Sequence, residues 1–590
     1  MTMYWIDYLI IIVYMIAVLG IGWYFSRDEN TSENYLLGGR NMPFLAIGIS
    51  CMMSLLSSIS IVMVPGEIYN NGVTLFILTP LIALPLGIPC YLLFTRFYFA
   101  LGSYTPYEYL EYRYDPTVRL VVAISAFYGR VLYLGMVLYT TSKIFEGAYG
   151  WPAWFTILLV GLFGIAYTVM GGMKAVVWTD VLQFFVLFGG FVIIVAVLCC
   201  NISGGAWEAV SCAFREGHGL PQFAEPDFYT LSPYVRLLFF LMLWNALMTP
   251  LTQACSDQIN IQRLLSTRNW REGFKSQIVS TTFGILSMLI LFFVGMAIFT
   301  YYRQNPDPAL ANAGGDTAFF HFVSTKLPAP IPGIFMAAML AAIMSTLDSG
   351  INSMATVWLK EFHQRYLNRK LTPKQEVSVS RYATFWVGAV AILLGLALDF
   401  SGKWLEQSVA EVDTIFGLLG AAVLPAFLFG VLSNRASSKL IWGYTFFAFG
   451  EGIAGNCWYV LSRKSEALWS PGEPLGWAGP LALQYVLMPL AIGLLLCLPW
   501  LLRRTGWPRK GLALLGMAVL GGAFGMLIWY CYSQMLITDV PRARSFAFGL
   551  PLSFIGAFIL LWFCPKQPRE KFQGLTLRTL GQPILARKAE

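Results

Sequence analysis

The chain has 590 residues, of which 57% are hydrophobic and only 12% are charged, and its mean hydropathy is +0.64. Soluble globular domains carry about 25% charged residues, so this composition excludes a soluble protein and indicates an integral membrane protein. The formal net charge of +8 comes from basic residues spread over several loops without an aromatic-interleaved patch, which argues against a nucleic-acid partner.

Apolar windows follow one another along almost the whole chain. A window of about 20 apolar residues can cross a hydrocarbon core about 30 Å thick as a helix, and the sequence contains about fifteen of them. The predicted fold class is therefore all-α and polytopic, with no large soluble domain. The windows lie at residues 5–25, 44–64, 74–99, 118–142, 153–173, 177–200, 233–256, 276–302, 333–358, 380–398, 411–432, 438–461, 481–502, 511–533 and 547–564.

Lysine and arginine concentrate in alternate loops, and such loops face the cytoplasm. We therefore expect a protein of the plasma membrane with its N-terminus outside and its C-terminus in the cytoplasm. The first window lacks a basic segment before it and a cleavage site, which predicts a retained helix. The loops assigned to the cytoplasm hold Arg263, Arg268, Arg271 and Lys275, then Lys360, Arg365, Arg369, Lys370 and Lys374, then Arg503, Arg504, Arg509 and Lys510, and finally Lys566 to Lys588.

Cysteine and histidine give no sign of a metal or catalytic centre. The 10 cysteines lie mostly inside apolar windows without a ligand-like CxxC pair, and His218, His321 and His363 lie outside the windows. An intramembrane enzyme would need a nucleophile and base or a metal cluster at membrane depth. We therefore predict neither an enzyme nor a cofactor.

Two windows combine polar residues with proline. In the second, four serines within 54–60 precede Pro65 and Gly66, where we expect the helix to break and free backbone carbonyls. In the seventh, Pro250 lies among hydroxyls and amides. Two interrupted helices five windows apart are typical of an inverted repeat of five plus five helices with mid-membrane sites. A simple proline kink with closely packed serines is the alternative.

The ninth window carries a row of side-chain oxygens. Ser345, Asp348 and Ser349 share one helix face, with Thr346 one step around. Sodium, a hard cation, prefers oxygen ligands, which these side chains and freed carbonyls could supply. In the sixth window Asp180 is either an N-cap or faces this row.

Several segments resemble, in order and spacing, the sodium/solute symporter family, which includes the sodium/glucose, sodium/iodide, sodium/monocarboxylate and sodium/multivitamin cotransporters. The resemblance covers residues 5–460 and implies a LeuT-like inverted five-plus-five repeat, with one extra N-terminal helix and about four extra C-terminal helices. The resemblance implies four divisions of the chain. Residues 1–43 hold the extra N-terminal helix and the first cytoplasmic loop, and residues 44–200 and 201–432 form the two repeats. Residues 433–590 hold the accessory C-terminal helices and a basic cytoplasmic tail. The resembling segments are 54–58 with 64–69, 105–113, 177–183, 257–263, 301–308 and 341–353.

The resemblance implies a sodium site between the first and eighth core helices. It would use the carbonyls of Met53, Leu56 and Ala342 with the hydroxyls of Ser345 and Thr346. Sodium is the only metal ion expected.

Some members of the family hold a second sodium ion. Its ligands would map to Asp180, Ser345, Asp348 and Ser349. Asp348 stands where those members carry serine or threonine, so it could strengthen the cation site, accept a proton or pair with a cation elsewhere.

The substrate pocket resembles the family less closely. Pocket positions of sugar-transporting members map to Leu55, Ile59, Ser60, Gln253 and Asp413, while the asparagine and glutamate typical of sugar binders are missing from the first core helix. Asp413 is either a solvated residue at a helix start or a pocket carboxylate, which would favour polyol hydroxyls or a cationic group.

The resulting prediction is a sodium-coupled symporter that imports a small polar organic solute of the sugar, sugar-acid, polyol or carboxylate class. The expected partners are sodium, the solute and the lipid bilayer, with no obligatory protein partner. A proton-coupled carrier that uses Asp180 and Asp348 is the alternative. A membrane sensor would need a signalling domain, for which the segment after Cys564 is too short.

Overall fold

The computed structural model describes residues 4–28, 31–219, 239–310, 314–368, 370–420, 423–445 and 549–582, with isolated positions between 447 and 523 and residue 584. Within these ranges the chain is helical and contains no β-strand, although an isolated bridge pairs Met42 with Thr267. The prediction of an all-α protein is confirmed.

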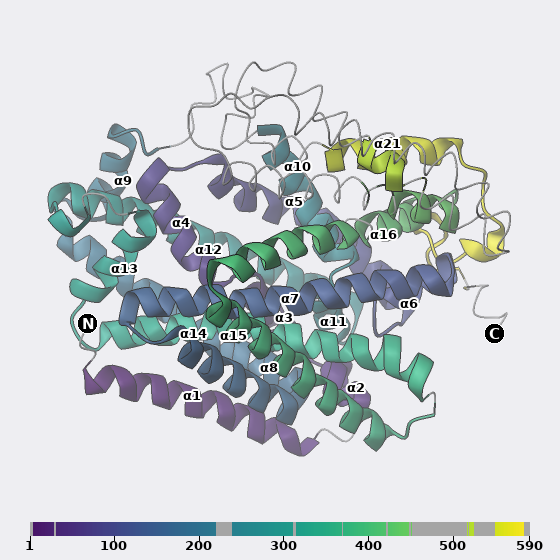
Figure 1. Ribbon diagram of the computed structural model, residues 1–590, viewed down its shortest axis with the longest axis horizontal. Coiled ribbons are helices and arrows are strands. Elements are labelled where there is room, and N and C mark those ends of the chain that lie inside the picture. Colours follow the sequence, from purple (N-terminus) through teal and green to yellow (C-terminus); the bar gives the residue numbers. More distant parts are fainter. Residues whose placement is uncertain are drawn as a thin grey trace. The chain divides into compact units, whose positions relative to one another are not determined.

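The helices carry the labels of Figure 1. A π-helical segment, Trp358–Leu367, continues α14. The helices are α1 (Trp5–Phe25), α2 (Ser32–Leu37), α3 (Phe44–Leu55), α4 (Ser58–Asn71), α5 (Leu75–Leu101), α6 (Tyr107–Arg113), α7 (Pro116–Tyr149), α8 (Ala153–Asn201), α9 (Gly205–Arg215), α10 (Phe239–Cys255), α11 (Gln258–Leu265), α12 (Trp270–Gln304), α13 (Gly315–Thr325), α14 (Ile331–Val357), α15 (Pro373–Gly420), α16 (Val423–Leu432) and α21 (Gly549–Phe563).

Seven of the described helices are long and apolar enough to cross a membrane, and the bent pair α3–α4 would be an eighth. The helices α1, α5 and α12 coincide closely with predicted windows. The windows 438–461, 481–502 and 511–533 lie mostly outside the described residues.

The second predicted window is a broken helix, but its break precedes the predicted position. Helices α3 and α4 meet at an angle of 60°, and Leu56 between them is extended, with φ −90° and ψ 97°. Ser57 then caps α4 by accepting the backbone N–H of Ser60 at 3.3 Å. The expectation of a break at Pro65 and Gly66 was wrong, because α4 runs through both residues.

The fifth and sixth windows both lie in α8, in which two helices meet at a kink at Gly172. This residue has φ 51° and ψ −142°, which L-residues with a side chain rarely adopt. A Cβ atom at Gly172 would also lie 2.4 Å from the carbonyl oxygen of Tyr35. The close approach and the backbone angle both require glycine at this bend.

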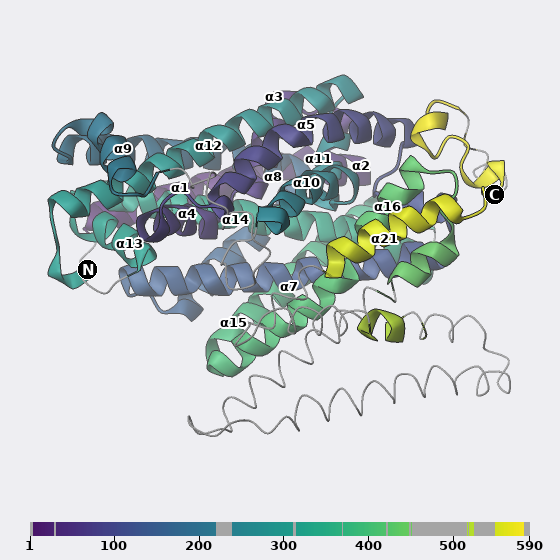
Figure 2. The ribbon, with the colours of Figure 1, turned by 90° about the horizontal axis from the view of Figure 1, so that it is seen from above.

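The chain divides into two compact units. The first contains Met1–Pro106, Arg130–Phe228 and Met242–Glu406. At its centre lies α14, whose apolar window is 94% buried and which packs mainly against α8 and α1. Figures 1 and 2 both show α1 beside α8. These units are not the two predicted repeats, so the repeat boundaries stay a prediction.

The second unit contains Tyr107–Gly129, Tyr229–Leu241 and Gln407–Glu590. Here the buried guanidinium of Arg113 donates to the carbonyls of Gly430 at 3.1 Å and Ser433 at 2.7 Å, at the end of α16. It also donates to the carbonyl of Lys571, in the segment 565–582 that we call the C-terminal tail. Arg113 therefore joins α6, α16 and the tail.

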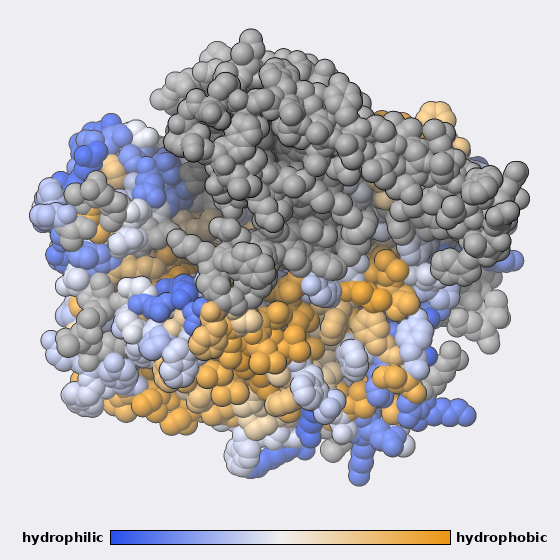
Figure 3. All heavy atoms as spheres, in the orientation of Figure 1, coloured by the Kyte–Doolittle hydropathy of each residue, from blue (hydrophilic) through white to orange (hydrophobic). Residues whose placement is uncertain are grey.

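The surface of the first unit is divided by polarity. On the face seen in Figure 3, hydrophilic side chains gather over α9 and α13, and apolar side chains cover the surface beside them. Exposed apolar side chains on α8 include Leu162 at 57% and Phe185 at 64%. An apolar surface of this kind is what a helix bundle presents to lipid.

Candidate functional site

The break between α3 and α4 lies directly beside α14. The hydroxyl of Ser345 donates to the carbonyl of Met53 at 3.1 Å and to the carbonyl of Ala342 at 3.0 Å. The hydroxyl of Thr346 donates to the same carbonyl of Ala342 at 3.1 Å. The structure thus brings together four of the five residues predicted for the first sodium site.

The fifth residue, Leu56, lies at the break itself and is 3% exposed. Because α3 ends here, carbonyls of its last turn have no following helical N–H to accept from. The cluster is fully enclosed, since Ser345 is 0% and Thr346 4% exposed. Hydroxyl and carbonyl oxygens in a dry setting suit a hard monovalent cation.

A second polar cluster surrounds Arg263, which was predicted to lie in a cytoplasmic loop. That placement was wrong, because its side chain is 1% exposed and forms an ion pair with Asp180. One guanidinium nitrogen donates to Asp180 Oδ2 at 3.2 Å and to the Ser349 hydroxyl at 2.5 Å. The Nε atom donates to the Ser50 hydroxyl at 2.7 Å, and this hydroxyl donates to Asp180 Oδ2. Asp180 therefore faces the hydroxyl row of α14 and does not cap a helix, because α8 continues through it.

Asp348 lies at the other side of the same cluster. Its Oδ2 atom accepts the hydroxyl of Tyr167 at 2.7 Å, and its Oδ1 atom accepts the hydroxyl of Ser349 at 3.1 Å. The Ser349 hydroxyl also lies 3.0 Å from that of Ser54 on α3. The sequence interpretation missed Ser50, Tyr167 and the burial of Arg263. None of the three had a signal in the sequence, because α11 alternates polar residues such as Asn260 and Gln262 with apolar ones.

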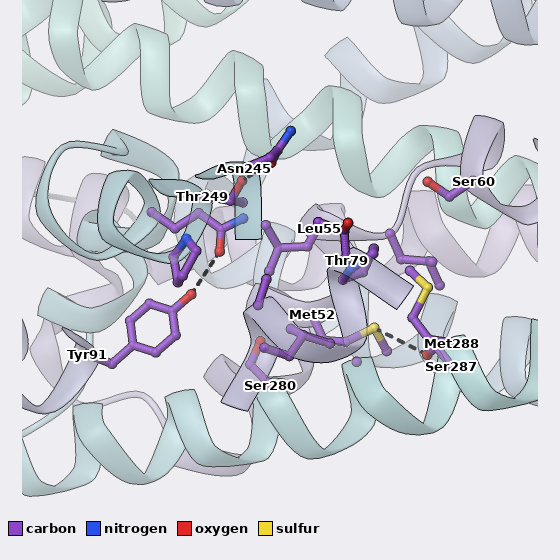
Figure 4. Close-up of a pocket in the computed structure, with 17 residues that line it drawn as sticks. Met52, Leu55, Ser60, Thr79, Tyr91, Asn245, Thr249, Ser280, Ser287 and Met288 are labelled. Carbon is purple, nitrogen blue, oxygen red and sulfur yellow. Dashed lines mark hydrogen bonds between the residues drawn. The ribbon is translucent and has the colours of Figure 1, made fainter. Parts of the chain in front are cut away.

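A cavity of about 240 Å³ lies beside the end of α3 and the start of α4. Its lining includes Leu55, Ser60 and Gln253 of the predicted substrate pocket, and Leu56 as well. Figure 4 shows Tyr91 and Ser60 at opposite ends of this cavity. Ile59, on α4, is not among the described lining residues.

Polar groups line this cavity without a formal charge among its described residues. The hydroxyl of Tyr91 donates to the side-chain oxygen of Gln253 at 2.9 Å, and that of Thr249 donates to Asn245 at 2.6 Å. Apolar side chains such as Leu84 form the rest of the wall. The side chain of Asp413 lies outside the described residues.

The fold and sequence have known counterparts. The model of the sodium:solute symporter family matches residues 35–443. The sodium/sialic acid symporter of Proteus mirabilis is 28% identical over 440 residues, which are 73% of this chain and 86% of the relative. The sodium/glucose cotransporter of Vibrio parahaemolyticus is 27% identical over 74% of this chain and 82% of the relative.

A solved structure of a Na⁺-coupled sialic acid symporter, in a substrate-bound outward-open state, has the same fold. It superimposes with a TM-score of 0.69 at 23% identity and covers 89% of this chain and 98% of its own. The likeness confirms the predicted LeuT-like fold. Since the family model also matches well over half of the sequence, the chain belongs to the sodium:solute symporter family.

Proposed function

We propose that this protein uses the sodium gradient across the plasma membrane to import a small polar organic solute. The observation that carries the proposal is the Ser345 hydroxyl, which bridges the carbonyls of Met53 and Ala342 at the α3 break. A sodium ion would bind these oxygens with the Leu56 carbonyl and the Thr346 hydroxyl.

Coupling requires the ion to bind one conformation better than another. The proposed sodium ligands belong to α3, at its broken end, and to α14 in the core of the first unit. Bound sodium would hold the α3 end against α14, and its departure would release that end. Leu56 offers a sodium ligand through its carbonyl and also lines the solute cavity, so the two ligands would share one backbone segment.

The cavity lining narrows the solute class. An ionised solute buried without a charged partner carries a large desolvation cost. The described lining offers amides and hydroxyls, including Gln253, Asn245 and Ser60, beside apolar walls. This favours an uncharged sugar or polyol over a sugar acid or a carboxylate.

Uptake into proteoliposomes tests the proposal directly. Labelled sugars, sialic acids, polyols, monocarboxylates and amino acids would be offered under an inward sodium gradient, an inward proton gradient or no gradient. Sodium-dependent accumulation of one class would support the proposal. Accumulation driven by protons alone would replace it with the proton-coupled alternative.

We further propose that the N-terminus and α9 face outward and that the first turns of α12 face the cytoplasm. Trp207 on α9 is 80% exposed, and the side chain of Lys275 is 56% exposed. In intact cells, an impermeant maleimide should label Trp207→Cys but label Lys275→Cys only after permeabilisation. The opposite pattern would reverse the orientation.

A further inference from the structure

Helix α21, in the second unit, keeps an exposed apolar face up to its last residue. On its other side, Phe554 and Phe558 pack against Phe429 of α16, with ring centroids 5.4 and 5.9 Å apart. Figure 2 shows α21 beside α16 and leading into the C-terminal tail. Trp562 and Phe563, at the end of α21, are 72% and 81% exposed. Exposed aromatic side chains at the end of an apolar helix are typical of the membrane–water interface, so the next residues lie at the level of the lipid headgroups.

Two segments that are distant in the sequence meet at this end of α21. The guanidinium of Arg435 donates to the carbonyls of Trp562 at 2.6 Å and Cys564 at 3.0 Å, and the first of these contacts joins residues 127 positions apart. The backbone N–H of Gln567 donates to the carbonyl of Asn434 at 3.0 Å. We call the joined segments 433–439 and 565–571 the basic rim. Against one acidic residue, Glu570, they hold five basic residues, which are Arg435, Lys439, Lys566, Arg569 and Lys571.

Much of the positive charge of the basic rim is not neutralised within the protein. Lys439, Lys566 and Arg569 are exposed, and their side chains form no hydrogen bond or ion pair with another described residue. Arg435 and Lys571 instead bind backbone carbonyls, since Lys571 donates to the carbonyl of Tyr114 at 3.0 Å. Like charges gathered on one surface repel one another, so an anionic partner would stabilise the rim.

The basic rim is also fixed in shape. The hydroxyl of Tyr109 on α6 donates to the carbonyl of Leu575 at 3.1 Å, and Leu575 is 0% exposed. Within the tail, the hydroxyl of Thr579 donates to the carbonyl of Phe572 at 2.8 Å. The tail is therefore folded against α6 before any partner arrives, which lowers the entropy lost on binding.

We propose that the basic rim binds the phosphate headgroups of anionic phospholipids, while the exposed face of α21 contacts their acyl chains. Lysine and arginine form charge-assisted hydrogen bonds with phosphate, and basic segments beside a membrane helix attract anionic lipids. Membrane orientation alone would require positive charge on this side, but it would not require two distant segments to be joined. A lipid fits this surface better than a soluble anion because Trp562 and Phe563 lie directly beside the charges. The inference does not depend on sodium coupling or on the solute.

Native mass spectrometry of the purified full-length protein tests the inference, with phosphatidylglycerol or phosphatidylcholine of equal chain length added in detergent. The parent should bind phosphatidylglycerol more tightly, by roughly tenfold or more. Lys566→Gln combined with Arg569→Gln should weaken that binding by roughly 10- to 30-fold, since one basic residue near a membrane surface contributes about fivefold. The matched control combines Lys370→Gln with Lys374→Gln, which removes two exposed charges from the segment between α14 and α15 and should leave binding at the parent level.

Equal binding of the two lipids by the parent would overturn the inference. Parent-like binding of phosphatidylglycerol by the folded double variant would also overturn it, in favour of a soluble acidic partner. An equal loss in the control would show that net charge attracts the lipid without a defined surface, and the inference would again be wrong. Thermal unfolding checks that each variant is folded. If the double variant does not fold, Lys439→Gln decides, with an expected loss of about fivefold.

Discussion

Replacing Ser345 with alanine should raise the sodium concentration for half-maximal uptake by roughly 10- to 100-fold. The hydroxyl lies 3.1 Å from the Met53 carbonyl and 3.0 Å from the Ala342 carbonyl, so it belongs to both sides of the proposed site. A polar contact with a charged group contributes about 1.5–3 kcal/mol. Since each 1.4 kcal/mol is about a tenfold change in affinity, the loss of one ligand gives this range.

The assay is uptake into proteoliposomes as a function of external sodium, repeated at several solute concentrations. Solute affinity at low sodium should fall as well, because the coupling between two ligands is reciprocal. The change also removes the donor to two buried carbonyls, so thermal unfolding should be measured to separate lost stability from lost sodium binding.

Ser353→Ala is the matched control. Ser353 is also buried on α14, and its hydroxyl donates to the carbonyl of Gly350 at 2.9 Å, in the same local geometry as Ser345 to Ala342. Its sodium dependence should equal that of the parent. Parent-like sodium activation in a folded Ser345→Ala protein would refute the assigned role.

Three further changes address the rest of the structure. Asp180→Asn should lower stability by about 3–5 kcal/mol in a thermal or denaturant unfolding assay, because the guanidinium of Arg263 loses its buried carboxylate; a parent-like unfolding curve would contradict the buried ion pair. Gln253→Leu should raise the solute KM by about tenfold at saturating sodium, since the acceptor of the Tyr91 hydroxyl disappears from the cavity; an unchanged KM would place the solute elsewhere. Arg113→Gln should speed tryptic cleavage of the C-terminal tail several-fold, since the guanidinium contacts both α16 and that tail; equal cleavage rates would show that other contacts hold the tail.

The positions of the long apolar helices could be predicted from the sequence, because a helix needs about 20 apolar residues to cross the hydrocarbon core of a membrane. The break of the second window did not, because proline is only one way to interrupt a helix. Leu56 adopts an extended backbone, and Ser57 caps the next helix through the N–H of Ser60. Pro65 remains inside α4, where the serine cap has already started a new helix. A capping serine within a serine-rich segment gave no signal that distinguishes it from its neighbours.

The residues proposed for the first site were expected from the family resemblance, whereas the Arg263 cluster was not expected. The spacing of Ser345 and Thr346 places both on α14, but the contact of Ser345 with the Met53 carbonyl depends on how α14 packs against α3. Arg263 meets Asp180, Ser349 and Ser50 only through the packing of α11, α8, α14 and α3. A positive residue near a basic loop looks like a topological signal until its partners are known.

The two clusters act on the same helix in different ways. Helix α3 contributes Ser50 to the Arg263 cluster and Met53, about one turn later, to the proposed sodium site. The first contact depends on a cation that is part of the chain, so it persists whether or not sodium is present. The second would gain its cation only from solution. A helix held permanently at one turn and conditionally at the next can move mainly at its broken end, beside Leu56 and the solute cavity. On this reasoning the fixed contact between Arg263 and Ser50 would confine the sodium-dependent movement to the segment that lines the cavity.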